Sequence, residues 1–377
     1  MASLRKFTKR FVILLNIVIA LLFLITCCNA FLHPDKWWFI SLLAFFFPLF
    51  LIILLIFLFF WLFISPRWLL ISLISLIIGW KNIHAFFGMN PSRKDFAHKQ
   101  ENSIRIMTWN VRRWDEFITK KTGASGHRLH MLDLVNNQQA DLLCFQEFYE
   151  PDDSAISNIR YIRDKMHFPY YFFSHDYHNR ISKYSTGVVI FSKYPFLRNA
   201  RQTFIPDTTG STESLIEADI FVNGKRIRIY TTHLQSVLFK PKDFRDVEII
   251  RNAKDSLLQA SRSLAKKLKF ALSLRGYQAD TVRRHLDASP YPVIICGDFN
   301  DVPNSYTYFH IKGNRQDAFI SGSFGIGRTY IHISPTLRID YIFPDKSFKV
   351  LQCSKIVSPF SDHHAVLADL QLQDPKR

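Results

Sequence analysis

Cysteine is scarce in this 377-residue chain, and the five cysteines form no pattern typical of a metal site or a redox reaction. Cys27 and Cys28 lie in an apolar run near the N-terminus, and the other three lie in short apolar stretches typical of strands. The sequence contains no CxxC motif and no cluster of cysteine and histidine, so nothing in it indicates a structural zinc site. We therefore interpret the thiols as buried structural groups.

Acidic residues are almost absent from the first 88 positions. This region contains seven Lys or Arg residues and one acid, whereas the rest of the chain contains 41 basic and 30 acidic residues. The apolar residues are concentrated in the same region, and residues 89–103 are mostly polar. The composition therefore predicts a membrane region over 1–88, a linker over 89–103 and one basic domain over 104–373.

Two long stretches without charge predict membrane-spanning helices. Residues 11–31 follow four basic residues, and a helix of that length crosses the roughly 30 Å core of a bilayer. A cleaved signal peptide is the alternative, although more apolar sequence follows. Residues 37–64 carry no charge and have tryptophans near both ends, which suits the headgroup layer, and we expect Pro48 to kink this helix.

A third span is predicted over residues 68–87. Only 13 residues separate Arg67 from Lys81, so a buried or re-entrant segment is the alternative. With the basic N-terminus in the cytoplasm, three spans place the following domain outside, and two keep it inside. We expect a multi-pass protein of the cytoplasmic membrane, held in the lipid bilayer by three spans, with its large domain on the extracytoplasmic side.

The remainder of the chain predicts many strands and few helices. Strand patterns occupy 104–110, 141–147, 187–192, 214–221, 226–232, 292–300, 338–343 and 365–372. Helical patterns occupy 127–139 and 241–285, and residues 304–328 are expected to form a variable loop. This order predicts an α/β protein with a two-sheet sandwich rather than a regular βαβ series.

Polar side chains recur at the ends of the predicted strands. Asp298 and Asn300 follow an apolar run, and strand alternation points both to one face, where they could bind a divalent cation or position a water. A capped turn is the alternative interpretation. Further polar residues at strand ends are Asn110, Glu147, His233, Asp362 and His363, and Asp340 lies within its own strand.

This set of residues resembles the endonuclease/exonuclease/phosphatase superfamily, which has the DNase I-like fold. The matching segments are Thr108–Asn110, Phe145–Glu147, Thr232–Leu234, Gly297–Asn300, Arg338–Tyr341 and Ser361–His363. The resemblance extends over roughly residues 104–372. It implies a membrane-anchored member of bacterial type that hydrolyses a phosphate ester, a phosphodiester or phosphomonoester, with a metal ion.

The resemblance also implies a role for each residue. Glu147 would be the main Mg²⁺ ligand, with Asn110 close by and Asp362 assisting, and Mn²⁺ is the alternative ion. Asp298 would deprotonate the attacking water, and Asn300 would hold a water or phosphate oxygen. His363 would contact the scissile phosphate as a cation paired with Asp340, and His233 would donate to a phosphate oxygen. His364 is expected to be structural.

Substrate identity stays open at this point. Arg112, Arg113, Arg180 and Lys183 are candidates for binding phosphate, and a solvated basic surface explains them equally well. The basic residues around Lys266 could attract nucleic acid or anionic lipid, or could only keep a helix soluble. The substrate could be a nucleic acid, a phospholipid such as sphingomyelin, or an inositol phosphate. A catalytically silent domain that binds anionic ligands is the alternative, and no obligate protein partner is evident.

Overall fold

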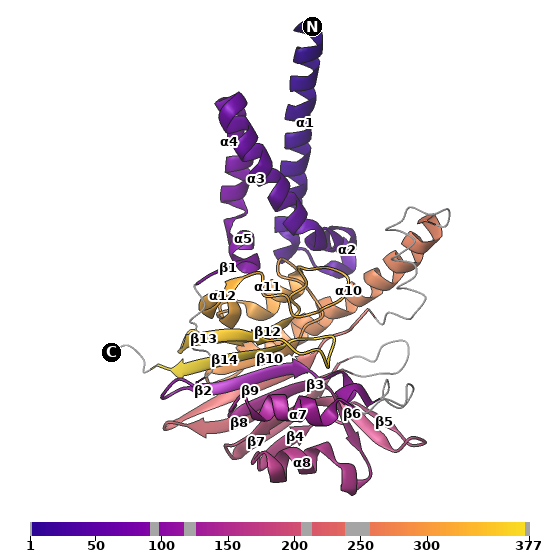
Figure 1. Ribbon diagram of the computed structural model, residues 1–377, viewed down its shortest axis with the longest axis vertical. Helices are drawn as coiled ribbons and strands as arrows, with labels where there is room; N and C mark the ends of the chain where they lie inside the picture. The colour runs from indigo at the N-terminus through magenta and orange to yellow at the C-terminus, as the bar shows by residue number, and fades with distance from the viewer. Residues whose placement is uncertain (1, 91–97, 117–125, 205–212, 238–256, 374–377) are drawn as a thin grey trace. The chain divides into compact units, whose positions relative to one another are not determined.

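The computed structural model describes residues 2–90, 98–116, 126–204, 213–237 and 257–373. The chain divides into two compact units. The first comprises residues 1–86, 235–279 and 302–310, and the second comprises residues 87–234, 280–301 and 311–377. Figure 1 labels the helices and strands of both units.

The first unit is built mainly of apolar helices. They are α1 (Ala2–Cys27), α2 (Pro34–Leu43), α3 (Phe47–Ile64), α4 (Leu69–Ile78) and α5 (Trp80–Phe86). Two stretches, Leu4–Ala30 and Pro34–Ile64, are long and apolar enough to cross a membrane. The pair α4–α5 is bent by 63°, so it is a third span only if both helices are counted together. The number of spans therefore stays a prediction.

The predicted kink at Pro48 is replaced by a short break before it. A 3₁₀ turn over Ala44–Phe46 separates α2 from α3, and Pro48 lies in the first turn of α3. A proline there removes no helical hydrogen bond, because the first N–H groups of a helix have no partner within it.

Close contacts join α1 to α4 and α5. The Oγ atom of Ser72 donates a hydrogen bond of 3.0 Å to Oδ1 of the buried Asn16. A Cβ atom at Gly79 would lie 2.4 Å from the ring of Phe23, so only glycine allows this approach. Small residues and polar pairs of this kind are typical of helix contacts within membranes.

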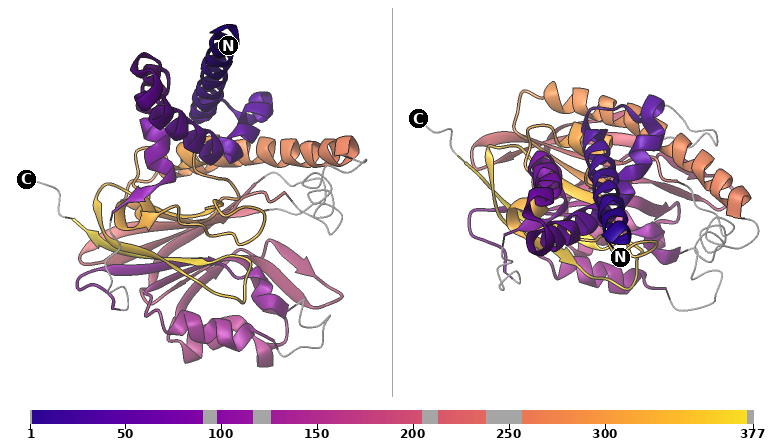
Figure 2. Two further views of the ribbon diagram at one scale, coloured as in Figure 1. Left: turned by 45° about the horizontal axis from the view of Figure 1, so that its top comes forward. Right: turned by 90° about the horizontal axis from the view of Figure 1, so that it is seen from above.

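The second unit contains two main sheets, stacked as layers (Figures 1 and 2). The five-stranded sheet has the order β12-β10-β9-β8-β7, and the seven-stranded sheet has the order β13-β14-β2-β3-β6-β4, with β5 paired to β6. Among the described strands, β9–β10 and β2–β3 are the pairs that run in parallel. The predicted two-sheet α/β sandwich is confirmed.

The strands of the first sheet are β7 (Phe196–Thr203), β8 (Ser214–Val222), β9 (Lys225–His233), β10 (Val293–Asp298) and β12 (Asp340–Pro344). Those of the second are β2 (Ile104–Asn110), β3 (Leu142–Pro151), β4 (Tyr170–Phe173), β5 (Tyr177–Asn179), β6 (Tyr184–Ser192), β13 (Phe348–Ile356) and β14 (Ala365–Leu372).

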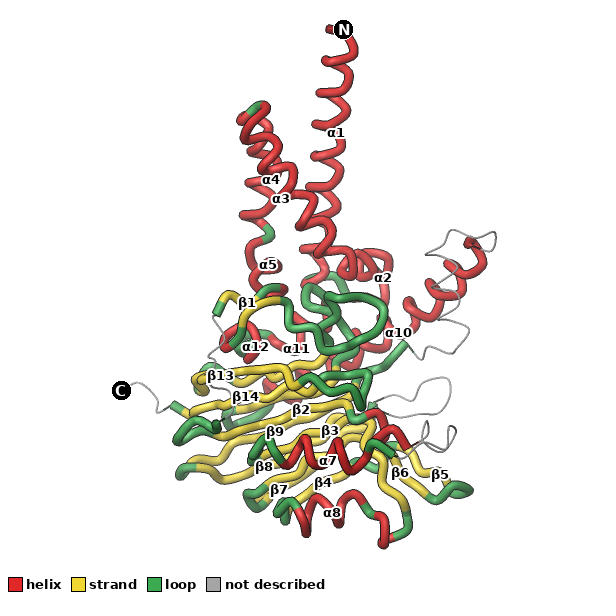
Figure 3. The backbone as a smooth tube through the Cα atoms, in the orientation of Figure 1, coloured by secondary structure: helices red, strands yellow, loops and turns green. Residues whose placement is uncertain are grey.

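Strand alternation divides the apolar side chains between two cores. Ile104 and Ile106 of β2 pack between the sheets with residues such as Ile229 and Ile294. The opposite face of β2 packs beneath α7 (Arg128–Asn136), and α8 (Asn158–Lys165) contributes to the same outer core. Figure 3 shows both helices against the strands. The rigid sandwich therefore fixes where each strand ends.

The segment predicted as a loop over 304–328 contains two short helices. It contains α11 (Tyr306–Lys312) and α12 (Ala318–Gly322), followed by β11 (Phe324–Gly325), which pairs with β1 (Gly88–Met89). Asp317 caps α12 by accepting hydrogen bonds from the N–H groups of Phe319 and Ile320. The predicted basic helix appears as α10 (Leu257–Asp287), and residues 238–256 lie outside the described part of the chain.

Candidate active site

Polar residues from both sheets meet at the ends of β2, β9 and β10. These strands end at Asn110, His233 and Asp298. Nδ2 of Asn110 donates a hydrogen bond of 3.0 Å to Oδ2 of Asp298, which joins the two sheets directly. The structure therefore brings Asn110, His233 and Asp298 together, and their roles stay predictions.

Glu147 reaches the same place by a different route. It lies within β3 rather than at its end, because the pairing of β3 with β6 shifts between Phe145 and Phe148. Glu147 has a φ of 48°, and this bulge leaves its Oε1 atom 3.5 Å from Nδ2 of Asn110. The expectation of a strand end was therefore wrong for Glu147.

Asp298 is fully buried at the end of β10. The preceding Gly297 has a φ of 144°, and a Cβ atom there would lie 2.0 Å from the carbonyl oxygen of Thr232. Oδ1 of Asp298 accepts a hydrogen bond of 2.8 Å from the N–H of Asn300. Asn300 has a φ of 52°, so a turn, not the predicted strand alternation, brings it beside Asp298.

Asn300 also connects the site to β9. Its Nδ2 atom donates to the carbonyl oxygen of Leu234 at 2.8 Å and lies 3.0 Å from Nε2 of His233. Nε2 of His233 lies 3.6 Å from Oδ2 of Asp298, and its Nδ1 lies 3.3 Å from Oε2 of Glu213. His233 is therefore held between two carboxylates.

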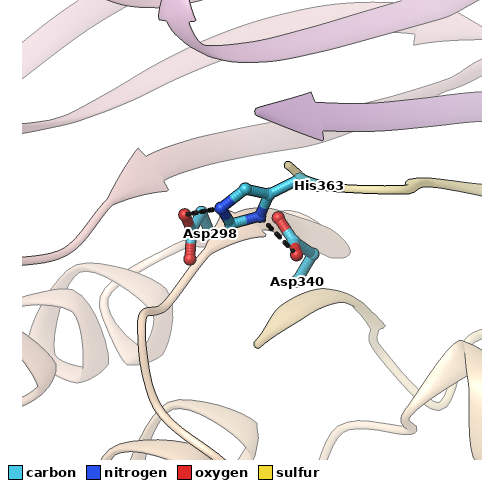
Figure 4. A group of neighbouring side chains, drawn as sticks. All are labelled: Asp298, Asp340 and His363. Carbon is cyan, nitrogen blue, oxygen red and sulfur yellow. Dashed lines mark hydrogen bonds and ion pairs between the residues drawn. The ribbon is translucent and has the colours of Figure 1, made fainter. Parts of the chain in front are cut away.

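His363 has the same kind of environment. Its Nδ1 lies 3.0 Å from Oδ2 of Asp340, and its Nε2 lies 3.7 Å from Oδ2 of Asp298 (Figure 4). The backbone of His363 is held as well, because its N–H donates to Oγ of Ser361 and its carbonyl accepts from Nε1 of Trp109. Asp362 and His363 precede β14 rather than ending a strand, and His363 forms an isolated bridge with Tyr330.

The surrounding carboxylates favour the charged form of both imidazoles. Burial opposes the charge on His363, but Asp340 and Asp298 outweigh it and raise its pKa to about 10. For His233, burial is likewise outweighed, by Glu213 first and then by Asp298 and Glu147, and its pKa is also raised to about 10. Two imidazolium groups therefore flank Asp298 at neutral pH.

Two groups of side chains offer ligand atoms for a metal ion. Asp298, Asp340 and His363 place ligand atoms within 4.8 Å of one another. A protonated imidazole has no lone pair to offer, however, so this cluster suits proton transfer better than metal binding. Glu147, Asn110 and Asp362 supply hard oxygen atoms, and the side chains of Glu147 and Asp362 are partly exposed. This second group offers the kind of atom that a hard divalent cation prefers.

Basic residues border the proposed metal ligands. Nε of Arg113 lies 3.7 Å from Oε2 of Glu147, and Nε of Arg112 lies 3.6 Å from Oδ2 of Asp362. Arg112 therefore lies beside Asp362, and its role in binding substrate phosphate stays a prediction. Arg180 is exposed in the turn between β5 and β6, and within the described residues no hydrogen bond or ion pair links it to the site.

Two residues of the site were missed in the sequence. Glu213 precedes β8 as a single acid, and Tyr330 lies in an irregular segment, so neither had a pattern to mark it. The ring of Tyr330 lies 5.0 Å from that of His363, and burial, with Asp362 and Asp298 adding to it, raises its pKa to about 12. His364 accepts a hydrogen bond from the N–H of Ser358, and its structural role stays a prediction.

Comparisons with known proteins match both parts of the chain. A model of the endonuclease/exonuclease/phosphatase family matches residues 107–363, and a model of a domain of unknown function (DUF8431) matches residues 9–86. No curated protein matches the chain. Three solved structures resemble it: an endonuclease/exonuclease/phosphatase from Beutenbergia cavernae, the human Nocturnin catalytic domain with bound sulfate, and a family protein from Leptotrichia buccalis.

These likenesses are distant in sequence. The Beutenbergia cavernae protein is 18% identical, with a TM-score of 0.51 and 72% of each chain covered. The Nocturnin domain is 16% identical, with a TM-score of 0.51, and the match covers 74% of this chain and 99% of that chain. The Leptotrichia buccalis protein is 17% identical, with a TM-score of 0.50, and the match covers 71% of this chain and 100% of that chain. At such identities the solved structures show the fold alone.

Proposed function

The chain belongs to the endonuclease/exonuclease/phosphatase family, and we propose that it is a membrane-anchored, Mg²⁺-dependent enzyme that hydrolyses a phosphodiester by in-line attack of water. Family membership implies a hydrolase of the phosphoesterase type. The observation that carries the proposal is the buried carboxylate of Asp298, which lies within 4 Å of His233, His363 and Asn110. A proton acceptor thus lies beside two cations and an amide.

Asp298 is the proposed acceptor of the proton from the attacking water. Its Oδ1 atom accepts the N–H of Asn300, so the carboxylate is fixed while Oδ2 faces the imidazoles. Positioned acid–base groups of this kind accelerate reactions by roughly 10²–10⁴-fold. Asn300 would hold the water or a phosphate oxygen through its side-chain amide.

His363 is the proposed cation at the scissile phosphate. Asp340 holds Nδ1, which leaves the Nε2 side of the ring facing Asp298 and the site. Charge held in place before the reaction stabilises a transition state in which negative charge develops on phosphate oxygens. His233 would donate to another phosphate oxygen from the opposite side of Asp298.

Glu147, with Asn110 and Asp362, would hold Mg²⁺, or Mn²⁺ as the alternative. When bound, the ion would act as a Lewis acid on the phosphate oxygens. The donor set supports this assignment because all three side chains offer oxygen atoms, and the half-buried Glu147 carboxylate stays accessible. The nearby Arg113 would then contact the substrate phosphate or move aside.

Membrane anchoring in the cytoplasmic membrane is the second part of the proposal. It is supported by the two helical stretches that are apolar enough to span a bilayer, preceded by Lys and Arg residues. With α4–α5 as a third span, the catalytic domain lies on the extracytoplasmic side. Reporter fusions after Gly88, beyond α5, test this orientation, and activity of a reporter that works only in the cytoplasm would contradict it.

A substrate panel tests the proposed activity. Full-length protein in detergent would be assayed on DNA, RNA, sphingomyelin, lysophospholipid and inositol phosphates, with Mg²⁺ or with a chelator. We expect Mg²⁺-dependent hydrolysis of one class, lost in Asp298→Ala and His363→Ala. If wild type and variants behave alike on every class, the domain is a silent binder of anionic ligands and the proposal is wrong.

A further inference from the structure

Helix α10 carries an exposed stripe of cations in the first unit. Arg262, Lys266 and Lys269 are exposed and follow one another at intervals of four and three residues, so they lie on one face of the helix. Ser273 and Tyr277 continue this face at intervals of four. The cationic stripe, defined as Arg262, Lys266 and Lys269, therefore runs into a neutral segment of the same face.

That neutral segment contacts α2. The hydroxyl groups of Ser273 and Tyr277 both donate to the carboxylate of Asp35. A Cβ atom at Gly276 would lie 2.8 Å from Cγ of Pro34, so glycine permits the close approach of the two helices. Further along the stripe, Nζ of Lys269 lies 5.6 Å from the centre of the Trp38 ring.

Helix α2 lies where the chain would pass from headgroups into the bilayer. It begins shortly after α1 and opens the apolar stretch Pro34–Ile64. Trp37 and Phe39 are exposed, and tryptophan favours the headgroup layer. In Figures 1 and 2, α10 extends sideways from the base of α1 rather than alongside it. With α1 and α3 spanning a bilayer as proposed, Lys269 beside Trp38 would lie at the depth of the headgroups.

We propose that the cationic stripe binds the anionic headgroups of phospholipids in the bilayer that holds α1 and α3. The inference rests on the proposed anchoring and adds a lipid preference to it. Charge complementarity supports it, since three cations near an anionic surface correspond to a preference of roughly a hundredfold. Nucleic acid would also suit three cations, but the contact of Lys269 with Trp38 favours the membrane.

The test uses the full chain in nanodiscs of phosphatidylcholine alone or with phosphatidylglycerol. Amide hydrogen exchange is followed in peptides that cover residues 262–269. We expect exchange at least about fivefold slower in the discs with phosphatidylglycerol, and a smaller difference at high salt. The variant with Arg262→Gln, Lys266→Gln and Lys269→Gln should lose this difference. The matched control changes Arg160, Arg163 and Lys165 of α8 to Gln and should keep it.

Each outcome is decisive. Failure of the chain to enter discs of either composition would overturn both the anchoring and this inference. Incorporation without any effect of phosphatidylglycerol would overturn the inference alone. Protection of residues 262–269 by single-stranded DNA, without protection by phosphatidylglycerol, would identify a nucleic-acid surface and contradict lipid binding.

Discussion

Nδ1 of His363 lies 3.0 Å from Oδ2 of Asp340, and both side chains are buried. The pairing determines which ring nitrogen faces Asp298, and it contributes to the raised pKa of His363. The two residues come from separate segments, β12 and the loop before β14. Their contact therefore links the position of the proposed cation to the folded sandwich.

Replacement of Asp340 by Asn tests that link. Asp340→Asn keeps the shape of the side chain but removes the charge that stabilises the imidazolium, so we expect kcat to fall by roughly 10²–10⁴-fold. The alkaline limb of the pH–rate profile should move to lower pH, because the pKa of His363 falls. The Mg²⁺ concentration for half-maximal activity should not change. An unchanged alkaline limb would argue against a positioning role for Asp340.

The charge of His363 predicts a pH dependence of stability. Its pKa is about 10 in the fold against 6.5 for an ordinary histidine, so its ion pairs stabilise the fold fully below pH 6.5. This stabilisation is lost as the pH rises to about 10. With a chelator present, the Tm of the wild type should fall more between pH 6.5 and about 10 than the Tm of the His363→Gln variant does. His233 titrates in both proteins, so parallel curves would contradict the assignment.

Substitutions of two glutamates on β3 distinguish an effect on metal binding from an effect on folding. Glu147→Gln should raise the half-saturating Mg²⁺ concentration by at least about tenfold, because it removes the main charged ligand. Glu150 instead accepts the N–H groups of Asn158 and Ile159 at the start of α8. Glu150→Gln should destabilise the fold by about 0.5–2 kcal/mol and leave the Mg²⁺ dependence unchanged. Metal titrations and thermal unfolding of both variants check this, and equal Mg²⁺ dependence would exclude Glu147 as a ligand.

A buried ion pair joins β2 to β14. Nε of Arg105 lies 2.6 Å from Oδ1 of Asp369, and the two side chains are 1% and 0% exposed. Arg105→Met leaves the buried Asp369 without a counter-charge, with Gln100 and Gln352 still donating to it, and should cost about 3–5 kcal/mol. Arg160 and Asp164 form an exposed pair, so Arg160→Met should change stability by less than about 1 kcal/mol. Equal effects at Arg105 and Arg160 in urea unfolding would contradict this account.

The strands and most of the site could be predicted because their signals are local. Strand β2 was predicted with its observed bounds, since Ile104 and Ile106 of one face alternate with Met107 and Trp109 of the other. Asn110, His233 and Asp298 come at the ends of segments with a strand pattern, where a polar residue stands out. The order of these residues along the chain then matched a known family.

The remaining features depend on contacts between distant segments. The bulge that turns Glu147 into the site arises from pairing with β6, and Glu213 reaches His233 only through the packing of β8 against β9. Arg105 resembles a solvated residue of a strand until Asp369 is placed beside it. Helix α12 was missed because Asp317 and five following residues provide too short a pattern.

The rate of phosphodiester hydrolysis by Asp298→Asn tests the central claim most directly. The full-length wild type and variant would be compared at saturating Mg²⁺ on bis(p-nitrophenyl) phosphate and on the best substrate of the panel. Asparagine fills the same volume beside Asn110 and Asn300 but accepts no proton, so we predict that kcat falls by roughly 10²–10⁴-fold while the variant stays folded. A folded Asp298→Asn variant with wild-type kcat would contradict the account.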